Sequence, residues 1–106
     1  MRDETTLGGY FDRHERPPAF EGKDGKAYSV SIIPSEEKEP DGFGAALMFI
    51  RWSETGDAPV GHVETKYLVF ASTPDDAEAE ICTLSLHDVK RHLDNAIELE
   101  GQRSEW

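Results

Sequence analysis

The stretch that decides the fold is Phe43–Trp52, FGAALMFIRW, which holds no polar residue before Arg51. Its ten residues have the length of a strand, and a strand covered on only one face would alternate apolar with polar side chains. An uninterrupted apolar run is typical of a strand that is covered on both faces. We therefore predict that residues 43–52 form the central strand of a sheet.

Upstream of this strand, Pro18–Ile33 has the pattern of a β-hairpin. Asp24-Gly25 lies at its centre, and Asp-Gly is a favoured turn pair because glycine accepts a positive φ without steric cost. After the turn, Tyr28, Val30 and Ile32 alternate with serines, the period of two expected of a strand buried on one face. We expect Pro34 to end this strand and the polar residues 35–42 to form a loop.

Downstream, the loop 53–59 precedes a long β-rich segment, which predicts a fourth strand over Val60–Ala71. Strand alternation divides this segment into two faces. One face would hold Val63, Thr65, Tyr67, Val69 and Ala71, and the other His62, Glu64, Lys66, Leu68 and Phe70.

Two helix starts follow. Thr73-Pro74-Asp75-Asp76 combines a capping hydroxyl, a proline in the first turn and two carboxylates near the helix N-terminus. Ser85-Leu86-His87-Asp88 is a second capping signature, so we predict two helices rather than one. The second runs from Leu86 to about Leu99, with Gly101 as its C-terminal cap.

This order of elements predicts an α+β fold: an antiparallel β-meander of three or four strands followed by two consecutive helices packed on one face. Residues 18–106 would form this single domain, and residues 1–17 a flexible N-terminal tail. Two helices on one face leave the other side of the central strand open. We expect the tail or a second copy of the chain to cover it, and we favour a homodimer.

Composition limits the classes of partner. The chain of 106 residues has 22 acidic and 11 basic residues, a formal net charge of −11. Such a surface argues against binding to nucleic acids or anionic membranes, since both attract basic proteins. No apolar run has the length of a membrane span, and residues 1–6 lack the apolar core of a signal peptide. We expect a cytoplasmic protein.

Few residues indicate chemistry. His62 with Glu64, and Asp88 with His92, are two pairs that each share a face of their element and have the side chains that zinc ligands use. They form the metal-site hypothesis. The alternative is that Asp88 caps its helix and His92 lies at the surface. Cys82 lies beside the apolar stripe and reads as a core residue. The chain shows no nucleophile elbow and no phosphate-binding glycine loop, so we expect no catalytic residue and no cofactor.

These observations predict a small acidic, non-catalytic protein-interaction or regulatory module that self-associates through an apolar sheet face. Large aromatic side chains with a polar rim are typical interface anchors. The expected contact residues are Met48, Ile50, Arg51, Trp52, Tyr67, Leu68 and Phe70. Three alternatives remain: a basic protein partner steered by the acidic surface, a structural subunit of a larger assembly, and a metal-dependent or small-ligand enzyme that uses His62, Glu64, Asp88 and His92.

Overall fold

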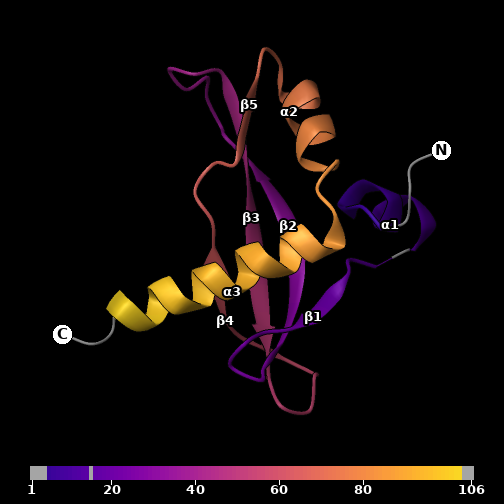
Figure 1. The fold of residues 1–106 in the computed structure, drawn as a ribbon, viewed down its shortest axis with the longest axis vertical. Coiled ribbons are helices and arrows are strands. Elements are labelled where there is room, and N and C mark those ends of the chain that lie inside the picture. Colours follow the sequence, from indigo (N-terminus) through magenta and orange to yellow (C-terminus); the bar gives the residue numbers. More distant parts are fainter. Residues whose placement is uncertain (1–4, 15, 104–106) are drawn as a thin grey trace.

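The structure is a computed structural model that describes residues 5–14 and 16–103. It has the predicted α+β architecture, an antiparallel sheet followed by two helices (Figure 1). The elements are α1 (Leu7–Arg13), β1 (Ala19–Glu21), β2 (Ala27–Pro34), β3 (Phe43–Trp52), β4 (Pro59–Glu64), β5 (Val69–Ala71), α2 (Pro74–Ile81) and α3 (Leu86–Arg103).

The apolar strand β3 is at the centre of the sheet, as its sequence predicts. On one side it pairs with β2 from Tyr28↔Arg51 to Pro34↔Ala45, and β1 continues the sheet beyond β2. On its other side it pairs first with β4 and then with β5. Every pairing is antiparallel, so the chain forms a meander that suits the short turns between its strands.

The predicted single strand over Val60–Ala71 is wrong, because the chain leaves the ladder between Glu64 and Val69. Two residues of β3 lie between the paired positions Ala45 and Met48, whereas four residues, 65–68, lie opposite them. Two extra residues do not change the strand phase, so β5 resumes the faces of β4. The bulged segment stays attached because the Leu68 N–H donates to the Ala45 carbonyl at 2.8 Å.

All three helices lie on one side of the sheet, with α3 running across the strands (Figure 1). The odd-numbered residues of β3 face them, because successive side chains of a strand point to opposite faces. The buried core consists of Tyr28, Val30, Ala45, Leu47, Phe49 and Val63 from the sheet and Leu7, Ala77, Ile81, Val89, Leu93 and Ala96 from the helices. The even-numbered residues of β3 therefore point to the side without helices.

The flexible tail expected over residues 1–17 contains α1, which is docked on the domain. Thr6 caps this helix by accepting a hydrogen bond from the Gly9 N–H, and Leu7 is completely buried. The Leu7 and Gly8 N–H groups donate to the carbonyls of Leu84 and Cys82, at 2.8 and 2.9 Å. Burial and these hydrogen bonds outweigh the low helix propensity of Gly8-Gly9.

The two predicted helix starts are confirmed: Thr73 accepts from the Asp76 N–H and Ser85 from the Asp88 N–H. The predicted end of α3 is wrong, because the helix continues through Gly101 to Arg103. Gly101 does not adopt the left-handed conformation of a C-terminal cap. Glu100 instead holds this last turn by pairing with Arg51 at 2.6 Å. No helix in the described ranges is long and apolar enough to cross a membrane.

Candidate functional site

The first candidate site is the sheet face turned away from the helices, which we call the open face. A row of β3 side chains, which we call the spine, runs along its centre and consists of Ala46, Met48, Ile50 and Trp52. Ser29 and Ser31 flank it on β2, and His62 and Glu64 flank it on β4. The apolar residues of the open face include Ile33, Ala46, Met48, Ile50, Trp52, Tyr67 and Phe70.

Residues on the adjacent strands β2 and β4 hold the side chains of the spine in place. Met48 lies opposite Ser31 and Glu64, and Ile50 lies opposite Ser29 and His62. The Trp52 indole Nε1–H donates to the Ser29 hydroxyl at 3.0 Å, which lays the tryptophan across the β2–β3 pair. Trp52 is therefore held in place before any partner binds, which lowers the entropy cost of using it as an anchor.

Tyr67 and Phe70 extend the open face beside Gly44. Their rings meet edge to face, with centroids 5.9 Å apart. A Cβ on Gly44 would lie 2.8 Å from Tyr67 Cγ and 3.2 Å from Phe70 Cε1, so glycine is what lets the two rings lie on β3. Both rings remain 37–38% exposed, among the most exposed large apolar side chains of the described residues.

Five of the seven predicted contact residues lie on the open face, and Arg51 and Leu68 do not. Arg51 points to the helical side, where it donates from Nε to the Tyr28 hydroxyl at 2.7 Å and from Nη2 to Glu100. Leu68 is partly buried against the core. Arg51 lies on the helical side because it directly follows Ile50, and successive side chains of a strand point to opposite faces. Leu68 turns toward the core because it belongs to the bulged segment 65–68.

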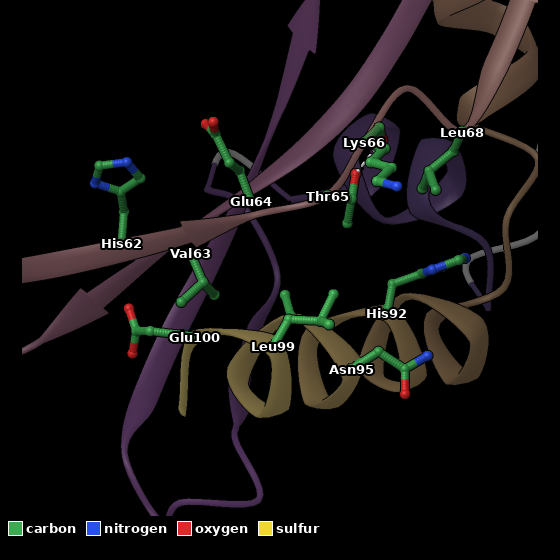
Figure 2. A pocket seen from close by; sticks show the side chains of 11 residues that line it. His62, Val63, Glu64, Thr65, Lys66, Leu68, His92, Asn95, Leu99 and Glu100 are labelled. Carbon is green, nitrogen blue, oxygen red and sulfur yellow. Dashed lines mark hydrogen bonds between the residues drawn. The ribbon is translucent and has the colours of Figure 1, made fainter. Parts of the chain in front are cut away.

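The four residues of the metal-site hypothesis do not form one ligand set, although His62, Glu64 and His92 line a common cavity. His62 and Glu64 point away from α3, whereas His92 lies on α3 itself (Figure 2). Asp88 is engaged by the Arg91 guanidinium at 2.8 Å, and the cap of α3 is Ser85 rather than Asp88. Within residues 5–14 and 16–103, no group of three or more His, Cys, Asp or Glu side chains is arranged to hold a metal ion.

The second candidate site is a cavity of about 510 Å³ between the outer edge of β4, the bulged segment and α3. Val63, Leu68, Ala96 and Leu99 provide its apolar surface, and Thr65, Lys66, His92, Asn95 and Glu100 its polar surface, with His62 and Glu64 at the strand edge. Burial and the neighbouring Arg91 charge lower the pKa of His92, which favours the neutral imidazole, although Asp88 opposes the shift.

Three of the four residues expected at a metal or small-ligand site, His62, Glu64 and His92, line this cavity, but its apolar part and its bulged segment were not predicted. Its residues come from two elements that are about thirty positions apart, and no periodicity within one element signals a space between two. The one available signal is Leu99, a large apolar residue at the end of an amphipathic helix that remains 52% exposed.

Comparison with known proteins adds no constraint on function: no family model matches the chain, and neither the curated proteins nor the solved structures contain a significant match.

Proposed function

We propose that this protein is a non-catalytic interaction module that forms a homodimer by packing the open faces of two copies against each other. The observation that carries the proposal is the spine of β3, where four successive outward positions, Ala46, Met48, Ile50 and Trp52, are all apolar. Ala46 is buried within the single chain, so Met48, Ile50 and Trp52, which are partly exposed, form the accessible part of the spine. An antiparallel sheet that faces water on one side normally places polar residues at such positions. An apolar spine of this kind fits a contact surface.

The distribution of charge favours a second copy as the partner. Among the strand residues that point to the open face, the carboxylates are Glu21 and Glu64, both away from the spine. The helices on the opposite side carry many more: Asp75, Asp76, Glu78, Glu80, Asp88, Asp94, Glu98 and Glu100. Face-to-face packing therefore joins the two surfaces where like charge is scarce and keeps the acidic helical layers outside.

The size of the face agrees with such a contact. The five strands have 3, 8, 10, 6 and 3 residues, which at about 3.3 Å per residue and about 4.8 Å between strands gives a face of roughly 475 Å². This is more than half of the ~800 Å² that each partner contributes to a standard protein interface, and the protruding side chains add to it. Two sheets packed in this way lie about 10 Å apart, close enough for the side chains of the two spines to interdigitate.

The direct test is Met48→Lys, which places a charge in the middle of the spine. Glu64 lies opposite residue 48 on β4, so the new ammonium has a cross-strand partner and the monomer keeps its fold. Two such charges buried at the centre of a dimer are strongly unfavourable. We expect the wild-type protein to sediment as a dimer at micromolar concentration and Met48→Lys as a folded monomer.

Two further variants complete this test. Trp52→Ala removes the ordered indole from the open face and should weaken the dimer, because central aromatic residues contribute much of the energy of an interface. Leu99→Gln alters an exposed apolar residue on the helical side and should leave the dimer unchanged. A monomeric wild-type protein, or a Met48→Lys variant that remains dimeric, would show the proposal to be wrong.

A further inference from the structure

We infer that the cavity between β4 and α3 binds a small amphiphilic acid, that is, a carboxylate carried on an apolar chain. The inference does not depend on the proposed dimer, because the side chains that carry it, Lys66, His92 and Leu99, come from the bulged segment and α3, and only the edge residues His62 and Glu64 are shared with the open face (Figure 2). The cavity would hold a small molecule, whereas the open face would contact another protein chain.

The body of the cavity suits an apolar chain. Its volume of about 510 Å³ is within the usual range for small-molecule sites, and four of its lining side chains, Val63, Leu68, Ala96 and Leu99, are apolar. Val63 and Ala96 are buried, so they form the floor, while Leu99 is 52% exposed at the rim. A bound apolar chain would shield Leu99 from water, which is a favourable change.

The polar groups of the cavity fix the sign and the position of the head group. Lys66, Leu68 and His92 gather at one end of the cavity, and Glu100 lies at the other (Figure 2). Within the described ranges, the Lys66 ammonium has no ion pair and no side-chain hydrogen bond. Of the two carboxylates in the lining, Glu100 is bound to Arg51 at 2.6 Å, and Glu64 points away from α3 (Figure 2). A ligand carboxylate would therefore lie at the Lys66 end, with the His92 ring nearby as a hydrogen-bonding group.

The length of the cavity sets the length of the chain. His92 and Leu99 are seven residues apart on α3, a distance of about 10 Å at 1.5 Å per residue. A medium-length acid spans this distance from its head group to the end of its chain. A much shorter acid would leave Leu99 uncovered and would lose the apolar part of the binding energy.

Octanoate is the appropriate probe, followed by the backbone amide signals of the ¹⁵N-labelled full chain in NMR titrations. We expect a Kd of about 1 mM or tighter, with shifts concentrated at Val63, Lys66, His92 and Leu99. Octylamine has the same chain with the opposite charge, and its affinity should be lower than that of octanoate by a factor of about ten or more. Butyrate, with the same head group and a shorter chain, should also bind more weakly.

Three matched variants locate the site. Lys66→Gln removes the charge at the head-group end and should weaken octanoate binding about fivefold. Lys38→Gln removes an exposed lysine from the loop before β3 and should have no effect. Leu99→Gln makes the rim polar and should weaken octanoate more than butyrate. Thermal unfolding of each variant shows whether the fold is retained.

Three results would overturn the inference: equal affinities for octanoate and octylamine, equal effects of Lys66→Gln and Lys38→Gln, or amide shifts that spread over the open face. Trp52→Ala separates this inference from the proposed dimer, because Trp52 does not line the cavity, whereas Glu64, the cross-strand partner of residue 48, does. The variant should weaken the dimer and should bind octanoate with unchanged affinity, so either proposal can fail without the other.

Discussion

The Tyr28 hydroxyl lies between two charged side chains, donating to Asp24 Oδ2 and accepting from Arg51 Nε, each at 2.7 Å. Arg51 in turn holds Glu100 on the last turns of α3. One phenol therefore links the β1–β2 turn, the central strand and the C-terminal helix. Burial, together with the hydrogen bond to Asp24, raises the pKa of Tyr28 to about 12, although Arg51 opposes the shift.

Tyr28→Phe should lower the free energy of unfolding by about 1–3 kcal/mol, because it leaves Arg51 Nε and Asp24 without their shared partner. The raised pKa adds a second expectation. Between pH 10 and pH 12 the unfolded tyrosine is ionised and the folded one is not, so wild-type stability should fall through this window. Urea denaturation across that range measures both effects.

The Phe variant should lack this part of the alkaline loss, since it has no phenol to ionise. Tyr67→Phe is the matched control, because Tyr67 is exposed and its hydroxyl makes no hydrogen bond with the described residues. Parallel alkaline profiles for wild type and Tyr28→Phe would contradict the assignment.

The strands β2 and β3 could be predicted from the sequence, whereas the helix α1 could not. The alternation of Tyr28, Val30 and Ile32 and the run Phe43–Trp52 identified β2 and β3 because strand periodicity depends on the immediate neighbours. By contrast, α1 depends on the burial of Leu7 and on hydrogen bonds to Leu84 and Cys82, more than seventy positions away. A single sequence does not display such distant contacts.

The break between β4 and β5 also depends on contacts with another strand. It explains why the predicted position of Phe70 on the open face is correct and that of Leu68 is not. The hydroxyl of Thr65 accepts from the Leu47 N–H at 3.0 Å and donates to its neighbour's carbonyl, so a side chain replaces one rung of the ladder. The strand phase survives at Phe70, whose place on the open face was predicted, but not at Leu68 within the bulge. Arg51 could have been placed correctly from alternation alone.

The N-terminal cap of α2 offers a test at this scale. Thr73→Ala removes the oxygen that accepts from the Asp76 N–H at 3.1 Å and should lower the free energy of unfolding by about 1 kcal/mol. Thr73→Ser keeps that oxygen and should restore most of the loss, as measured by urea denaturation. If alanine and serine were equally stable, the hydrogen bond would contribute nothing to the helix start.

For the whole molecule, the net charge of −11 is divided unequally between two surfaces. The helical layer is acidic, and the open face is apolar along its spine with carboxylates only at its sides. This division matters because the two kinds of partner considered for the chain would use different surfaces. A basic protein would be drawn to the helices, whereas a second copy would be repelled there and, in the proposed dimer, would pack on the open face.

Salt separates these two modes of association. Two copies that each carry −11 repel one another at long range, and the screening length falls from about 30 Å at 0.01 M to about 10 Å at 0.1 M ionic strength. The dimer should therefore become tighter as salt is added, with Met48→Lys monomeric at both concentrations in sedimentation equilibrium. An interface built on ion pairs would loosen over the same range, and so would a complex with a basic protein. Dissociation of the homodimer by salt would thus place the contact on charged groups instead of the apolar spine of β3.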